Sequence, residues 1–132
     1  MSTIAAFTNA LAAVTLSGVT TVYDDIPREL KASELPAQWV DMPAAVVSPD
    51  STFSTFDESG VRHVATIAVA VADVSEGYPA AQRTAVLAMA TTVEAWAITT
   101  PWQVEIFTAA RIAVGSREYR GVLARVTAEE FV

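Results

Sequence analysis

The sequence has no cysteine and a single histidine, His63, among its 132 residues. Without cysteine, the chain cannot build a disulfide framework, a thiolate nucleophile or a cysteine-based metal site. A catalytic triad, a histidine-rich metal site or a histidine general base would each need His63. That residue lies within a β-prone run and nothing near it marks it as reactive, so we interpret it as a structural or surface histidine.

Signature motifs of nucleotide-binding and hydrolytic proteins are absent as well. The five glycines are too few for a phosphate cradle of the usual kind, and no GxGxxG, P-loop or GxSxG pattern occurs. Paired carboxylates at 24–25, 57–58 and 129–130 are direct neighbours in polar sequence, which favours two solvated groups over an acid–base pair. A hard-cation site of loop carboxylates stays open as an alternative, although no EF-hand spacing is present.

Charged residues are also scarce. They make up 17% of the chain against 52% hydrophobic residues, and the formal net charge is −7. This acidic balance argues against binding of nucleic acid or anionic lipid through the whole surface. A domain so poor in charge often covers part of its surface with partners. We therefore expect an obligate oligomer.

The first 23 residues carry no charged side chain, which invites a signal-peptide or membrane interpretation. A signal peptide has a positively charged segment before its apolar run, and no lysine or arginine precedes the run here. Polar residues interrupt the run, so it falls short of a membrane span. We interpret it as a helix of the folded domain that begins at about Ile4 and is capped by Ser2 or Thr3. This helix is either a core helix whose outer face consists of small residues, or a helix packed between its own sheet and a neighbouring subunit.

The centre of the chain predicts a strand from Arg62 to Ala72, a turn, and a helix from about Ala80 to Thr99. The strand is small or apolar on both faces, which indicates that both faces are covered. The helix has one apolar stripe, and Pro79 suits its first position. A strand followed by a long helix is the core of an α+β domain. The stripe consists of Val86, Met89, Val93 and Trp96.

Upstream of this core, residues 19–23 are a short β-prone run, and residues 44–48 predict another strand. The stretch between them, residues 24–43, is rich in charge and proline and predicts a long loop. Trp39 in this loop is either an ordinary buried aromatic or an interface anchor. The course of residues 50–60 stays undecided between an irregular strand and a loop.

Downstream of Pro101, residues 102–114 and 118–127 predict two strands around a turn at 115–117. Gly121 indicates a bulge or a close approach of another backbone, and the acidic tail AEEFV is expected to be loose. The chain therefore predicts one α+β domain over residues 1–132, with a mixed or antiparallel sheet packed by two helices. The expected order is α-β-(long loop)-β-β-α-β-β, ending in a β-hairpin.

Charge is unevenly distributed along the chain. Residues 1–60 hold eight acidic and two basic groups, whereas residues 111–125 hold four arginines and one acid. The arginines either form a solvated hairpin face or meet the acidic loop of a neighbouring copy, which would set register more than affinity. The candidate subunit or partner interface comprises Asp24, Asp25, Glu29, Trp39, Arg111, Arg117, Arg120 and Arg125.

Two segments, LPAQWVDMPAAVV (Leu35 to Val47) and YRGVLARVTAEEF (Tyr119 to Phe131), together with the element order, give the chain a family resemblance. It resembles the tail-terminator and tail-completion proteins of long-tailed bacteriophages and related phage-like particles. The resemblance implies a virion protein: a ring of about six copies that caps the tail tube, ends its growth and meets the head-side connector or stopper protein. It also implies no enzyme activity and no cofactor. Independently of the resemblance, we expect no metal site and no membrane contact, with DNA only passing through the channel.

Two other classes stay open. The first is another neck or tail component of a virion, such as a head–tail adaptor or a tail-tube protein. The second is a small cytosolic α+β enzyme or ligand-binding protein, which would need a defined pocket with convergent polar groups. The sequence offers no such set of residues that we can name.

Overall fold

The computed structural model describes residues 3–48, 60–77 and 79–131, and it confirms the predicted mixed α+β class. The undecided stretch 50–60 lies outside the described residues except for Gly60. The described chain has two α-helices, a short 3-10 helix and six strands. In chain order these are α1 (Ile4–Ala12), β1 (Thr21–Val22), η1 (Ala32–Glu34), β2 (Ala37–Val40), β3 (Ala44–Ser48), β4 (Gly60–Asp73), α2 (Pro79–Thr99), β5 (Gln103–Val114) and β6 (Arg117–Phe131).

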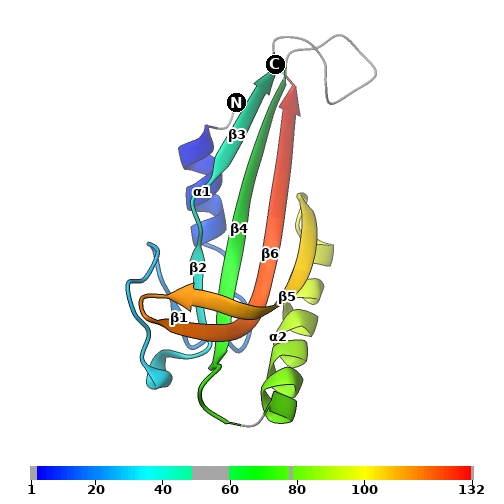
Figure 1. Cartoon of the computed structure of the whole chain (residues 1–132). Coiled ribbons are helices and arrows are strands. Elements are labelled where there is room, and N and C mark those ends of the chain that lie inside the picture. The colour runs from blue at the N-terminus through cyan, green and yellow to red at the C-terminus, as the bar shows by residue number, and fades with distance from the viewer. Residues whose placement is uncertain (1–2, 49–59, 78, 132) are drawn as a thin grey trace.

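The six strands form one curled sheet with the order β1-β2-β4-β6-β5, and β3 pairs with β4 beyond the end of β2. All pairs are antiparallel except β1 with β2. Figure 1 shows β3, β4 and β6 running side by side as a long arm, while the far ends of β5 and β6 bend across β2 and β4. The sheet therefore consists of a straight half and a curled half.

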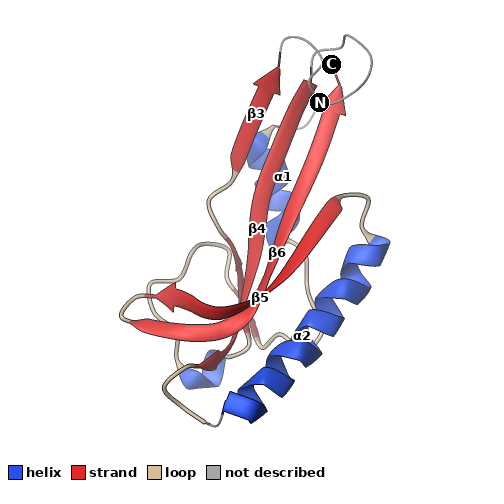
Figure 2. Ribbon diagram, turned by 45° about the vertical axis from the view of Figure 1, so that its right-hand side comes forward, coloured by secondary structure: helices blue, strands red, loops and turns tan. Residues whose placement is uncertain are grey.

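Both helices pack on the same face of the sheet. The predicted stripe of α2 is confirmed, because Val86, Met89 and Val93 are buried and Trp96 packs against the same core. Helix α2 begins at Pro79, as predicted, because proline has a helical φ and needs no partner for a missing N–H there. Figure 2 shows α2 lying obliquely along the β5 side of the sheet.

Helix α1 covers the other side of this face. Its cap is confirmed, because the Thr3 hydroxyl accepts a hydrogen bond from the Ala6 N–H at 3.0 Å. Phe7 and Leu11 are buried in the core shared with α2. Phe7 also stacks on the ring of His63, with 5.5 Å between ring centroids. His63 is thus a buried structural histidine at the contact between α1 and β4, one of the two roles expected for it.

A second core lies on the opposite face of the sheet, where the chain covers itself. Residues of the curled half of the β5–β6 hairpin and of the segment before β2 form one buried cluster with Trp39. The predicted long loop at 24–43 is therefore corrected: it contains η1 and a fully buried strand, β2. Trp39 is 2% exposed within a single chain, so it is a core residue and not an interface anchor. The members of this core are Leu30, Ala37, Trp39, Ala68, Ala70, Ile112, Val114 and Tyr119.

The expected loose tail is also corrected, because β6 continues to Phe131 and pairs with the first residues of β4. The Arg62 guanidinium binds Glu129 across this pair at 2.8 Å, which turns an acidic tail into a strand end. Two register shifts allow the sheet to curl: one in β4 between Ala70 and Ala72, and one in β5 between Ala109 and Ile112. Gly121 of β6 is paired with both strands next to these shifts.

Candidate interaction surfaces

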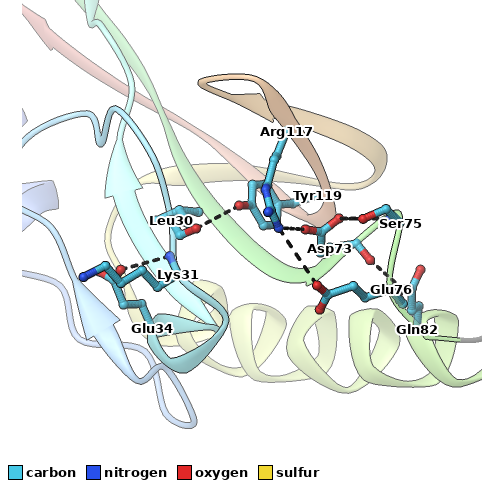
Figure 3. A network of polar contacts seen from close by, with 9 residues as sticks. All are labelled: Leu30, Lys31, Glu34, Asp73, Ser75, Glu76, Gln82, Arg117 and Tyr119. Carbon is cyan, nitrogen blue, oxygen red and sulfur yellow. Dashed lines mark hydrogen bonds and ion pairs between the residues drawn. The ribbon is translucent and has the colours of Figure 1, made fainter.

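A polar network at the end of β4 fixes the hairpin to the start of α2 (Figure 3). The Asp73 carboxylate is buried and accepts hydrogen bonds from the Ser75 N–H at 2.9 Å and the Ser75 hydroxyl at 2.7 Å. Its second oxygen accepts from the Arg117 guanidinium at 3.0 Å. A buried carboxylate with three donors is stable in its ionised form. The network therefore ties residues that are 44 positions apart in sequence.

Gln82 extends this network into the first turn of α2. Its buried amide donates to the Asp73 carbonyl at 2.7 Å and to the Glu76 carbonyl. Its amide oxygen accepts from Arg120 Nε at 2.7 Å. The β4–α2 turn is thus held by side chains from α2 and β6. A buried amide with all these partners specifies one geometry more than it adds net stability.

The electrostatics of the network follow from its hydrogen bonds. The two bonds from Ser75 lower the pKa of Asp73 below its ordinary value of 3.8, and the Arg117 charge lowers it further. The same contact raises the pKa of Arg117. Burial raises the pKa of the Tyr119 phenol, with a further contribution from the negative charge of Asp73. The Tyr119 hydroxyl donates to the Leu30 carbonyl at 3.2 Å, which holds the second core to the segment before β2.

The Asp73→Asn variant is expected to lose stability at pH 7 and to approach the wild type as the pH falls. Because the folded pKa of Asp73 is lower than its unfolded value, the carboxylate stabilises the fold above about pH 4. That contribution disappears as the pH falls through the folded pKa. Urea unfolding from pH 7 to pH 3 measures the difference between the two proteins.

The matched control is Glu76→Gln, which alters an exposed carboxylate 3.9 Å from the same Arg117 nitrogen. Exposed pairs at this distance contribute little, so this variant should follow the wild type closely at every pH. A difference in stability between Asp73→Asn and the wild type that stayed constant down to pH 3 would contradict the lowered pKa of Asp73 in the folded protein.

The acidic loop and the basic hairpin meet within one chain. The turn at Gly115 lies against the backbone of Arg28, where an added Cβ would come within 2.5 Å of the carbonyl oxygen. Arg28, Glu29 and Leu30 line a hollow of about 350 Å³ together with Gly115, Ser116 and Arg117. The hairpin tip therefore already has a partner surface in its own subunit.

The four predicted arginines have partners within the chain. Arg111 pairs with Glu118 at 2.7 Å, Arg117 with Asp73 at 3.0 Å, Arg120 with Gln82 as described, and Arg125 approaches Glu105 at 3.9 Å. Of the predicted acidic residues, Asp24, Asp25 and Glu29 are exposed. The structure thus gives the arginines intrachain roles and leaves these three carboxylates at the surface.

Sequence reasoning missed Asp73, Ser75 and Gln82. A signal for the first two was present, since aspartate with serine two residues later is typical of a side-chain-stabilised turn. No sequence signal marked Gln82, whose role depends on the packing of α2 against the β4–α2 turn.

Three exposed apolar side chains lie on or just before β3. Met42 is 80% exposed and Val47 is 71% exposed, and Val46 between them is also exposed. Within the residues that the structure describes, β3 pairs only with β4 and β5 pairs only with β6. Each of these strands therefore presents one edge with unpaired backbone groups. Such edges bind other strands unless charge, proline or a covering segment protects them.

A groove of about 580 Å³ runs between α2 and β5. It is lined mostly by apolar and small residues, with Arg83 and Arg120 as its charged members. Arg120 is already bound to Gln82. This groove has neither a nucleophile next to a base nor a pair of carboxylates, so its described lining suggests no reaction.

No cluster of three or more potential metal ligands occurs among the described residues. Neither helix in the described part of the chain has the combination of length and apolar character needed to cross a bilayer. A scan against protein-family models matches none, and searches of curated proteins and of solved structures return no similar protein.

Proposed function

We propose that this chain is a structural subunit that assembles into a ring of about six copies, of the tail-terminator type, at the head-proximal end of a phage tail. In this role it ends growth of the tail tube and joins the tail to the head connector. The observation that carries the self-association is the uncharged strand β3, which has a free edge and the exposed side chains of Val46 and Val47. The tail role itself depends on the family resemblance of Leu35–Val47 and Tyr119–Phe131.

The uncharged edge supports self-association for a physical reason. Monomeric proteins often protect edge strands with lysine, proline or a bulge. Residues 44–48 contain none of these, and the nearest prolines, Pro43 and Pro49, lie just outside the strand. An exposed apolar edge on a lone chain is an aggregation hazard. A closed ring removes all such edges at once.

The charge of the chain also fits a channel for DNA. A net charge of −7 per copy makes any ring strongly acidic, and acidic groups on the channel wall would let a polyanion slide without binding. A channel wall found to be basic in the assembled particle would contradict this part of the proposal.

The purified chain of residues 1–132 is expected to form a species of about six copies. Mass photometry over a concentration series gives the copy number, and negative-stain electron microscopy shows whether the species is a ring. Each alternative predicts a different result. A tail-tube protein would grow into long tubes, a head–tail adaptor would form a ring of another size, and a ligand-binding protein would remain a monomer or dimer.

A further inference from the structure

We propose that the ring closes by strand pairing: the free edge of β3 in one copy pairs with the free edge of β5 in the next. This inference rests on the proposed function and specifies the contact that forms the ring. It makes the contact heterologous, because two different edges of the same sheet meet at every junction.

The direction of the strands favours this pairing. Strands β3, β4, β6 and β5 lie in this order, and each is antiparallel to its neighbour. With an even number of alternating strands, the two edge strands run in opposite directions. A second copy placed beside the first in the same orientation therefore meets it as an antiparallel pair, and every further copy does the same.

The two edges do not lie at the same height along the sheet. Positions along β6 give a common scale for both edges. Val46 of β3 lies opposite Arg62 of β4 and therefore in the same row as Glu129 of β6. Ile106 of β5 lies opposite Ala124, five residues earlier in β6. Successive copies must therefore shift along the strand direction before the edges overlap. Such a stagger is a geometric requirement for closing a sheet into a barrel, because the strands must tilt from its axis.

Face alternation limits the possible shifts. In a continuous sheet the helices of adjacent copies lie on the same face. Because side chains alternate between the two faces, only a shift by an even number of residues keeps each side chain on the correct face. Only shifts of four and six place all of β3 against the straight part of β5, residues 103–109, before the register shift. A shift of four puts Ala44 opposite Phe107 of the next copy, and a shift of six puts Val46 opposite Phe107.

The tilt of the ring favours the shift of four over the shift of six. Four strands are about 19 Å wide, and four residues span about 14 Å, which corresponds to a strand tilt of about 35°. Closed barrels have tilts of about 35–45°, whereas a shift of six gives about 47° from the same spacings. The charges are compatible with this register, because residues 44–48 carry none and Glu105 then faces Val46.

Two lysine variants test which edges meet. Val47→Lys places a charge on the β3 edge strand and Phe107→Lys places one on the β5 edge strand, at side chains 71% and 48% exposed, so folding should be unaffected. Each variant alone should associate at least about tenfold more weakly than the wild type. Mixed in equal amounts, the two should form a one-to-one dimer that does not grow, because each retains one intact edge.

The control is Ile98→Lys, which charges a side chain 80% exposed on α2, outside both edge strands, and should assemble like the wild type. Self-pairing of either lysine variant, or a mixture that stays monomeric while the wild type assembles, would overturn the β3–β5 contact but not the ring. A wild-type chain that stays monomeric, together with double-cysteine variants that form no disulfide between copies, would overturn both proposals.

Engineered disulfides report the register, and the absence of native cysteine makes them specific. The Ala44→Cys/Phe107→Cys protein should oxidise to a ladder of linked copies, because facing residues of an antiparallel pair lie within disulfide range. The Val46→Cys/Phe107→Cys protein should be linked at least about tenfold more slowly, since its sulfurs are then in diagonal positions. Equal or reversed rates would contradict the shift of four, and no linkage in either would contradict the pairing.

Discussion

Replacement of Gly121 by alanine is expected to remove more than about 3 kcal/mol of folding stability. An added Cβ would overlap the Val69 carbonyl oxygen and would lie 2.8 Å from Cδ1 of Ile112. The carbonyl belongs to the backbone of β4, which is paired on both sides and cannot give way without breaking the sheet. Chemical denaturation of the two proteins at equal concentration measures the loss.

The control uses the same substitution at Gly18. There the backbone has a φ of +81°, but the nearest atom to an added Cβ is Cε of Met89 at 3.9 Å. Gly18→Ala should therefore cost about 1–2 kcal/mol, for the left-handed conformation alone. If Gly121→Ala cost no more than Gly18→Ala, the close approach of β6 to β4 would not be as described.

Gly121 was also the residue whose role the sequence indicated most directly. A glycine within an otherwise regular β-prone run predicts a bulge or a close approach, and the close approach is confirmed. The helix at Pro79–Thr99 and the strand at Gly60–Asp73 were predictable from local signals as well. The helix has a clear apolar stripe, and the strand is a long β-prone run that ends at a turn.

The missed elements lacked these local signals. Strand β2 has four residues that are all buried, so no alternation of polar and apolar positions marks it. The end of β6 has an acidic sequence, and its pairing depends on Arg62, which lies 67 residues away. In both cases the partner strand β4 determines the structure, and single-sequence patterns contain no information about that partner.

The candidate interface was predicted from charge, and the structure gives its four arginines partners within the chain. Opposite charges far apart in sequence can pair within a chain as easily as between chains, and Arg117 pairs with Asp73 of its own chain. The edges of β3 and β5 are a different kind of feature, because a free edge is a property of strand order. Strand order becomes visible only when the whole sheet is known.

Trp39→Ala is expected to lower the stability of the chain by about 3–5 kcal/mol, the usual cost of deleting a large buried aromatic. The indole fills the second core between the sheet and the curled hairpin, and its N–H donates to Asp41 at 2.9 Å. Thermal and urea unfolding measure this loss. Because the alanine variant is at risk of not folding, Trp39→Phe is the milder second variant, with an expected cost of about 1–2 kcal/mol for the lost hydrogen bond and contact area.

The interpretations of Trp39 as a core residue and as an interface anchor predict opposite effects on folding stability and on assembly. A core residue changes stability, and the folded Trp39→Phe protein still assembles with the wild-type copy number. An interface anchor would leave the stability of the isolated subunit unchanged and weaken assembly by a hot-spot amount, about 2 kcal/mol or more. Measuring unfolding and copy number by mass photometry on the same Trp39→Phe sample separates the two interpretations. We expect the result of a core residue, because residues Ala37–Val40 are buried within a single chain and need no contact with another copy.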